Sequence, residues 1–325
     1  MALKHTFVSS APEGSDASLV RTSNWNADHT IDTGGITIPY NSTAPTSPAV
    51  DNVTVFCTEI ANRAMPAFVG PSGLDSALQP LLARNKVSFW NPPGNATTAP
   101  GVFGFGTFTI VSNAGTTFTA RNVATTNVLT RMKRVAVVST NTSGTLGSLR
   151  DPQAQYTTGT GSGLGGFHYV ARFATSDAST VNGARAFVGM SSATNAPTNV
   201  DPATLVNSIG VAQLSGDATQ WYIVYGGSAA QTPIALGTSL GAPTLTTTAF
   251  ELSLFSAPST NGVVHYEVLN IGSGVKVTGT LTPGTPGVQT PLNTTLLAPR
   301  FWRTNNATGS VVGLDICSLY IETDQ

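Results

Sequence analysis

The sequence contains little charge. Lysine, arginine, aspartate and glutamate make up 10% of its 325 residues, against about 25% in a typical soluble domain. Long surface helices depend on such residues, so their scarcity disfavours a helical fold. The net charge is −1, whereas nucleic-acid binders generally carry a basic excess. The one basic cluster, Arg131 to Arg134, fits an exposed strand start or loop better than a binding patch, and we expect no nucleic-acid partner.

Cysteine and long apolar runs are also scarce. The only two cysteines, Cys57 and Cys317, are too far apart in sequence for a disulfide framework, and we expect both to remain thiols. No run approaches the roughly 18 apolar residues of a membrane span. The opening residues, MALKHTFVSS, lack the apolar segment of a signal peptide. These features predict no membrane insertion and synthesis in a cytoplasm without an export signal.

Signatures of catalysis and of cofactor binding are absent or out of context. A G-x-G-x-x-G pattern spans residues 161–166, but strand-like sequence follows it where a dinucleotide site needs a helix, which favours a loop. The four histidines show no metal-ligand spacing. His168 and His265 lie within aromatic strands and are expected to be packed or surface strand residues. We therefore expect no catalytic residue, no metal and no cofactor.

The sequence is rich in short β-type segments. From about Lys86 onward, more than ten β-branched or aromatic stretches are separated by Gly, Pro, Asn, Asp and Ser clusters. This pattern predicts an all-β fold, with a large antiparallel β-sandwich or jelly roll over residues 86–325. In QWYIVY, Trp221, Ile223 and Tyr225 share one strand face and Tyr222 lies on the other; one face must be core, and the other could present a ring to solvent.

The first 85 residues are organised differently. Residues 1–45 lack sustained periodicity and predict an extended arm. Residues 46–85 begin with a Pro- and Ser-containing linker, followed by VTVFCTEI and AMPAFVG, which predict a hairpin. A short helix is expected within residues 70–85, capped by Ser72 and interrupted by Pro80. We expect this middle segment to act as a hinge or in oligomerisation.

Two aromatic–polar features are candidate contacts for glycan. Tyr222 lies on the strand face opposite the core, where a ring can stack on a sugar. The segment APRFWRTNNATG combines aromatic, guanidinium and amide groups before the last strand, and fits a recognition loop through Trp302, Arg303 and Asn305. Ordinary loop packing is the alternative for this segment.

The opening segment resembles the N-terminal segment of tailed-bacteriophage fibre and tail proteins. These begin with a K-H-x-F-type piece and continue with an L-V-R-x-S-x-W-N-A-x-H core. GPSGLDSALQPLL is similar to a segment that precedes their distal domain. The strands from GGFHYVARF to GLDICSLYIET are similar to distal concanavalin-like jelly rolls of phage fibres. The residues that match the N-terminal motif are Lys4, His5, Phe7, Leu19, Val20, Arg21, Ser23, Trp25, Asn26, Ala27 and His29.

The resemblance implies a virion protein whose arm docks on other virion proteins of the tail or head. A segment without a core becomes ordered by burying residues against a partner. Trp25 is expected to fill a pocket on that partner, with Arg21, Asn26 and His29 supplying hydrogen bonds. The resemblance also implies a homotrimer and a distal domain that binds host cell-surface polysaccharide.

Three functions remain open at this point. The first is the receptor-binding fibre, and the second is a purely structural tail or head decoration protein. The third is a capsule-depolymerising tip, which needs two carboxylates beside the scissile bond. The β region has nine acids, and isolated surface positions are the better expectation for them: Asp151, Asp177, Asp201, Asp217, Glu251, Glu267, Asp315, Glu322 and Asp324.

Overall fold

The computed structural model describes residues 2–3, 29–30, 38–39, 45–46, 48–49, 52–60, 63–69, 86–92, 116–177, 179–243 and 247–323. The chain divides into two compact units, Met1–Pro80 and Leu81–Gln325, which are taken in turn. The predicted docking residues Arg21, Trp25 and Asn26 lie outside the described residues, as does the helix predicted within residues 70–85.

The first unit contains two antiparallel strand pairs. β1 (Ala2–Leu3) pairs with β2 (His29–Thr30). β3 (Thr54–Ile60) pairs along its whole length with β4 (Arg63–Val69), which confirms the predicted hairpin. Pro66 is accommodated within β4 because both strands of a two-stranded ribbon are edges.

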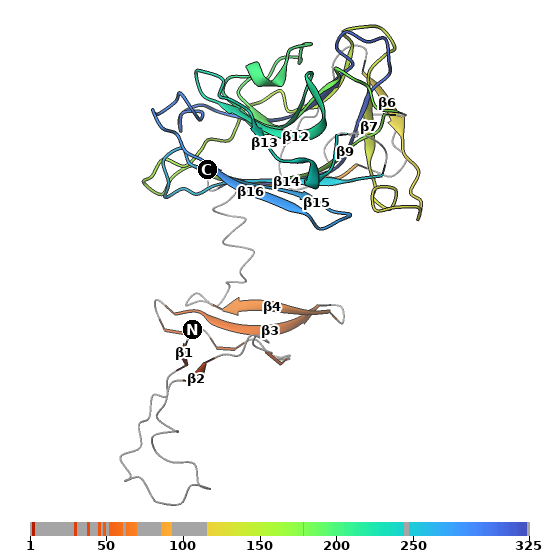
Figure 1. The fold of residues 1–325 in the computed structure, drawn as a ribbon. Coiled ribbons are helices and arrows are strands. Elements are labelled where there is room, and N and C mark those ends of the chain that lie inside the picture. Colours follow the sequence, from red (N-terminus) through yellow and green to blue (C-terminus); the bar gives the residue numbers. More distant parts are fainter. Residues whose placement is uncertain are drawn as a thin grey trace, which may run out of the picture. The chain divides into compact units, whose positions relative to one another are not determined.

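The second unit is built from two antiparallel sheets (Figure 1). In the larger sheet, seven strands run in the order β16-β15-β14-β9-β18-β7-β6, and β5 also pairs with β18. These eight strands are β5 (Lys86–Trp90), β6 (Thr117–Ala120), β7 (Val135–Val138), β9 (Phe167–Thr175), β14 (Phe250–Ser256), β15 (Val264–Asn270), β16 (Lys276–Leu281) and β18 (Gly313–Thr323).

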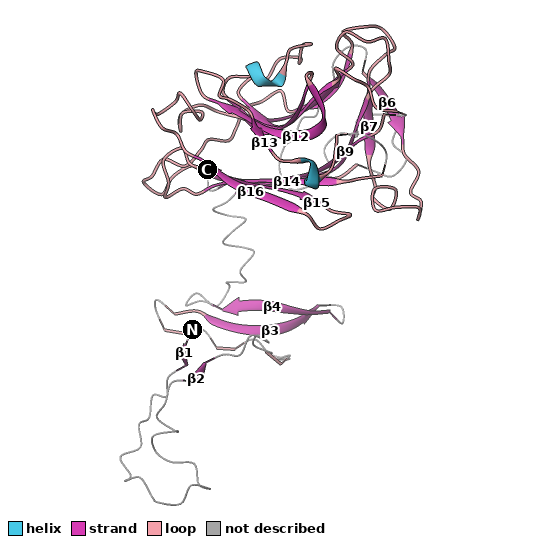
Figure 2. Ribbon diagram, viewed as in Figure 1, coloured by secondary structure: helices cyan, strands magenta, loops and turns pink. Residues whose placement is uncertain are grey.

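The smaller sheet has six strands in the order β13-β12-β11-β10-β17-β8. They are β8 (Leu146–Arg150), β10 (Arg185–Ser191), β11 (Ser208–Leu214), β12 (Asp217–Gly226), β13 (Ile234–Ala235) and β17 (Ala298–Thr304). Within the described residues, the helical elements are two short 3-10 turns, η1 (Pro202–Thr204) and η2 (Thr238–Leu240), drawn in cyan in Figure 2. No described helix reaches the length and apolar character needed to cross a bilayer.

The core lies between the inner faces of the two sheets. Trp221 of the smaller sheet contacts Phe173 and Phe250 of the larger one, with ring centroids 5.4 and 5.5 Å apart. All three rings are essentially fully buried, as is Ile223, so the expectation for Trp221 and Ile223 is confirmed. Each such ring contributes about 1.5–3 kcal/mol through burial. The all-β antiparallel sandwich predicted from the sequence is therefore correct.

Period-two alternation determines what the larger sheet presents to solvent. In β14, Phe250, Leu252 and Leu254 are buried, Glu251 and Ser253 between them are half-buried, and Phe255 is exposed. β18 has a register shift between Ile316 and Ser318, after which alternate residues point away from the core. This outward-facing set forms the surface described next.

Candidate functional site

A straight row of side chains crosses the outer face of the larger sheet. Glu322 of β18 pairs with His168 of β9, which pairs with Phe255 of β14. Phe255 pairs with His265 of β15, and His265 pairs with Thr280 of β16. These five residues belong to five neighbouring strands and are called the outer row. Because cross-strand partners stand side by side on one face, their side chains form a continuous strip.

The centre of the outer row is made of rings. Phe255 and His265 stack with centroids 6.4 Å apart and planes inclined by 23°. His168 meets Phe255 edge-on at 5.8 Å, and Tyr320 of β18 meets His168 edge-on at 6.4 Å. Phe255 is 44% exposed, although it is a large apolar side chain. An exposed phenyl ring supported on both sides by imidazoles offers a flat apolar surface to a ligand.

Hydrogen-bonding groups flank these rings. The Nδ1 atom of His265 lies 3.0 Å from the Thr280 hydroxyl. The Tyr320 hydroxyl donates a 2.8 Å hydrogen bond to the Glu322 carboxylate. Burial and this carboxylate raise the pKa of Tyr320 to about 12, so the phenol keeps its proton at neutral pH. Imidazole, hydroxyl and carboxylate groups thus surround an exposed ring.

Two shallow hollows meet at Phe255. One, of about 350 Å³, is bordered by His265, Glu267 and Thr280. The other, of about 190 Å³, is bordered by His168 and Glu322 and by the end of the Gly-rich loop. Ligand sites are typically concave, with apolar walls and a few placed polar groups. This arrangement can hold a flat, hydroxyl-rich ligand by stacking and hydrogen bonding.

The Gly-rich loop helps to define the second hollow. Gly161, Gly163 and Gly166 all have positive φ, and β9 follows them. The prediction of a loop in place of a phosphate-binding turn is therefore confirmed. A Cβ on Gly166 would lie 2.5 Å from the Ser256 carbonyl oxygen. Glycine is needed there because the loop passes directly against the end of β14.

Tyr222 lies on the outer face of the smaller sheet, on the side predicted. It is half-buried, and its hydroxyl donates a 2.6 Å hydrogen bond to Asp217. The Gln220 amide donates to the same hydroxyl at 3.0 Å. Hydrogen bonds from Thr219, Tyr222 and Gln220 hold the pKa of Asp217 well below its usual range. Tyr222 belongs to the opposite sheet from the outer row, and its role as a glycan contact stays a prediction.

Trp302 was expected in a recognition loop, and this expectation is wrong. Residues 298–304 form β17, which pairs with β10 and β8 inside the smaller sheet. Trp302 is 1% exposed and stacks on Phe187 at 6.3 Å. Leu205 and Leu214 pack against the same cluster. Its indole is therefore covered and does not present a face to solvent.

Arg303 and Asn305 are also corrected from surface contacts to interior groups, both being 0% exposed. Arg303 forms an ion pair with Asp177 and donates to the Gln213 amide oxygen at 2.6 Å. The Asn305 amide donates to the carbonyl oxygens of Thr142 and Ser310, each at 2.9 Å. The Arg303 guanidinium and the Asn305 NH2 group thus find partners inside the protein, which explains why a polar segment can be buried, although Asn305 Oδ1 has no hydrogen-bond partner among the described residues.

Of the four predicted docking residues, the described part of the chain includes His29 alone. It lies in β2, where its backbone pairs with Leu3. The docking role of Arg21, Trp25, Asn26 and His29 stays a prediction.

Most carboxylates of the second unit face a basic group or a phenol instead of another acid. Five are in ion pairs, and Asp217 and Glu322 accept hydrogen bonds from tyrosines. No group of three or more His, Cys, Asp or Glu residues within the described ranges is arranged to hold a metal. These five carboxylates make six ion pairs, which join Asp177 to Arg303, Asp201 to Arg185, Glu251 to Arg172, Glu267 to Lys276, and Asp315 to both Arg121 and Arg134.

Asp151 differs from these acids and supports a pH prediction. It is 2% exposed and is held by Gln153 N–H and by the Gln155 amide, at 2.9 and 3.2 Å. Burial raises its pKa to about 6. Between about pH 4 and 6 the folded protein therefore binds a proton that the unfolded chain has released. The contribution of Asp151 to stability falls as pH rises through this range and stays lower above it.

We expect Asp151→Asn to be more stable than the wild type at pH 7 by roughly 2–3 kcal/mol. The difference should vanish near pH 4, because the wild-type carboxyl is then protonated. Denaturant unfolding of both proteins at a series of pH values measures this difference curve. A variant less stable than the wild type at pH 7 would contradict the prediction.

Comparison with known proteins assigns the chain to no family, since no protein-family model and no curated protein matches it. Among solved structures, peanut lectin is 10% identical, with a TM-score of 0.46 over 74% of this chain and 97% of that chain. A lectin UEA-II complexed with galactose is 12% identical, with a TM-score of 0.45 over 73% and 98%. A carbohydrate esterase from the Shiga toxin-encoding bacteriophage phi24B is 19% identical, with a TM-score of 0.38 over 66% and 90%.

Proposed function

We propose that this protein is a structural fibre protein of a tailed phage or phage-like particle. Its N-terminal arm attaches to the tail or head, and its C-terminal sandwich binds host cell-surface glycan through the outer row. The outer row is the observation that carries the binding half of this proposal. The likeness of residues 4–29 to the arms of phage fibre and tail proteins carries the attachment half.

The chemistry of the outer row fits a sugar. A pyranose has an apolar face and a rim of hydroxyl groups, so it matches a ring bordered by hydrogen-bonding side chains. Phe255 supplies the apolar surface, and His265, Thr280 and Glu322 supply donors and acceptors. The two hollows beside Phe255 leave room for sugar residues on both sides of the ring. An open strip of this kind suits a polysaccharide chain.

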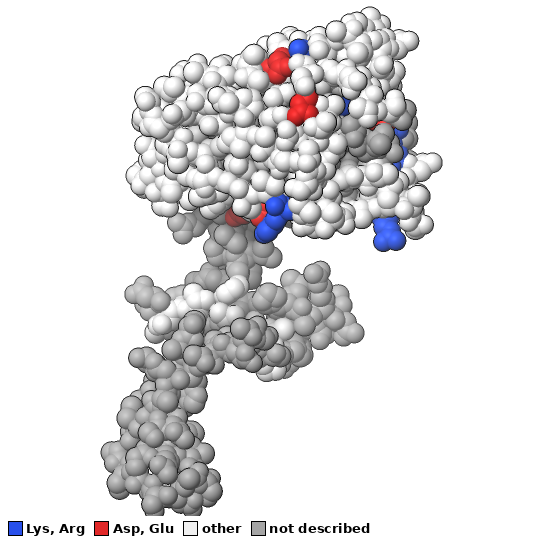
Figure 3. All heavy atoms as spheres, in the orientation of Figure 1, with Lys and Arg blue, Asp and Glu red and all other residues white. Residues whose placement is uncertain are grey.

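The sparse charge of the sandwich supports the same ligand class. On the face drawn in Figure 3, blue and red side chains are few and scattered among uncharged groups. A surface of this composition binds through hydrogen bonds and ring contacts, because it lacks the single-sign field that attracts strongly charged polymers.

We propose that the assembled fibre is a homotrimer. The β3–β4 hairpin is only two strands wide, and such a hairpin is marginally stable by itself in water. Val53, just before β3, and Val55, within β3, are 62% and 50% exposed. Other copies of the chain would cover this apolar surface.

Binding without hydrolysis is the expected activity. The carboxylates paired with basic groups are poorly placed to act as a general acid and a nucleophile. When the full chain is mixed with purified host polysaccharide, we expect saturable binding and no release of reducing sugar. Release would instead favour a depolymerase, and absence of binding would favour a purely structural decoration protein.

Removal of residues 1–40 tests the attachment half. We expect particles assembled with the truncated chain to lack the protein, because the arm carries the docking residues Arg21, Trp25, Asn26 and His29. The protein content of purified particles measures incorporation, and Trp25→Ala is the matched point variant. Unchanged incorporation of the truncated chain would contradict the docking hypothesis.

A further inference from the structure

A third hollow lies on the smaller sheet, away from the outer row. The segment that joins β10 to β11, residues 192–207 and here called the cover loop, passes over the outer face of the smaller sheet. Between them is a cavity of about 270 Å³. Its border includes the hydroxyl groups of Ser191 and Thr198, the Asn195 amide, the Arg300 guanidinium, and the side chains of Val206 and Trp302.

Arg300 is the charged group of this cavity. It is 7% exposed, and it stands directly opposite Arg150 of β8 in the sheet. The row that crosses the sheet at this level runs Arg150, Arg300, Gly189, Gly210 and Val224, and contains no carboxylate. Like charges placed opposite each other destabilise a sheet. Burial and Arg150 together lower the pKa of Arg300 to about 10.

Both arginines hold the cover loop. Arg300 Nη1 donates to the carbonyl oxygens of Ala193 and Asn195, the latter at 2.8 Å. Arg150 Nε donates to the carbonyl oxygen of Thr194 at 3.0 Å. No carboxylate of the described ranges pairs with Arg300, and its Nε and Nη2 atoms donate to no described residue. A largely buried guanidinium that pairs with no described carboxylate favours an anion.

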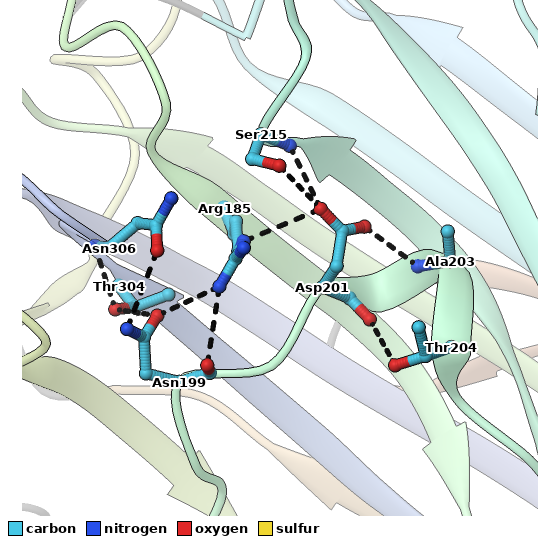
Figure 4. Close-up of polar contacts among 8 residues, drawn as sticks. All are labelled: Arg185, Asn199, Asp201, Ala203, Thr204, Ser215, Thr304 and Asn306. Carbon is cyan, nitrogen blue, oxygen red and sulfur yellow. Dashed lines mark hydrogen bonds and ion pairs between the residues drawn. The ribbon is translucent and has the colours of Figure 1, made fainter.

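The other end of the cover loop is fixed as well (Figure 4). Asp201 accepts hydrogen bonds from the Ser215 hydroxyl at 2.6 Å and from Ala203 N–H at 3.1 Å, and it pairs with Arg185 at 3.4 Å. Arg185 also donates to the Asn199 carbonyl oxygen at 3.2 Å. The cavity is therefore bordered by a loop anchored at both ends, and a ligand need not order it on binding.

We propose that this cavity binds the carboxylate of an acidic sugar residue, with Arg300 as the counter-charge. Val206 gives the cavity an apolar border, and Asn195 and Thr198 offer hydrogen bonds to ring hydroxyls. Its volume of about 270 Å³ suits one sugar residue, whereas the outer row suits a chain. The anion part follows from the cavity alone, and the sugar part rests on the proposed glycan function.

The test measures the affinity of the full chain for glucuronate by calorimetry or NMR titration. Glucose and inorganic phosphate are the comparison ligands. We expect saturable binding of glucuronate, weaker binding of phosphate and none of glucose. Arg300→Gln should weaken glucuronate binding roughly tenfold or more, because a charge-assisted hydrogen bond is lost. Arg172→Gln removes the same charge from the outer face of the other sheet, and should bind glucuronate as the wild type does.

Arg300 also holds the cover loop, so a second position separates binding from loop anchoring. Val206 borders the cavity and is 46% exposed. Val206→Glu should block glucuronate binding, because it places a competing carboxylate near Arg300. The Val206→Glu variant should therefore bind glucuronate more weakly than the Val206→Gln variant, whose new side chain is equally large. Equal binding of these two variants, equal affinity for phosphate and glucuronate, or no glucuronate binding would each overturn the proposal. Neutral polysaccharide binding at the outer row is measured separately, so either function can fail without the other.

Discussion

Arg303→Met is expected to lower the free energy of unfolding by about 3–5 kcal/mol, because it leaves a buried carboxylate without its counter-charge. Asp177 is 2% exposed, and its carboxylate accepts a 3.0 Å hydrogen bond from Arg303 Nε and a 2.8 Å bond from Gly313 N–H. Within the described residues, Arg303 supplies its only ion pair. The methionine fills much of the same volume but supplies no charge or donor.

Denaturant unfolding of the full chain measures this effect, and the double variant is its control. Arg303→Met combined with Asp177→Leu removes both charges, so we expect it to recover more than half of the lost stability. A loss below about 1 kcal/mol for Arg303→Met would contradict the interior role of this residue. Such a result would return Arg303 to the surface contacts first expected from the sequence.

Phe255→Ala is expected to weaken binding to host polysaccharide roughly 30-fold, the loss of a central contact worth about 2 kcal/mol. The ring is 44% exposed and borders both hollows of the larger sheet. Because it is outside the core, the free energy of unfolding should fall by only about 1 kcal/mol or less. The combination of a large binding effect with a small stability effect distinguishes a contact from a packing residue.

Val311→Ala is the control for Phe255→Ala. Val311 is 49% exposed and precedes β18, away from the outer row. It should bind polysaccharide as the wild type does. If the Phe255→Ala variant and the wild type bound polysaccharide with equal affinity, the outer row would not be the binding site.

Much of the fold follows from short-range patterns in the sequence. The β-branched and aromatic strands between turn residues predicted the antiparallel sandwich, and the two runs around Ala61 and Asn62 predicted the β3–β4 hairpin. Trp221 and Tyr222 were assigned to opposite faces correctly, because a strand has a strict period of two. These features depend on neighbours along the chain.

The site was harder to predict because it depends on which strands become neighbours. His168, Phe255 and His265 belong to segments separated by long stretches of sequence, and only the strand order places them side by side. One signal was present: Phe255 shares its parity with Glu251 and Ser253, so a large ring falls on the polar face of β14. That mismatch could have identified the outer row.

The prediction of a recognition loop around Trp302 failed for a related reason. Its arginines, asparagines and threonines are typical of a loop, yet Arg303 and Asn305 find partners from distant segments, Asp177 and Thr142 among them. A buried polar group is recognised only once its partners are known. Local composition therefore predicted exposure where the fold provides burial.

Binding of the full chain to intact host cells, with and without soluble surface polysaccharide and with reducing sugar assayed in the same tube, tests the central claim most directly. The account predicts saturable binding that the polysaccharide competes away, with no release of sugar. Binding that survives saturating polysaccharide, or no binding at all, would contradict a glycan-binding fibre.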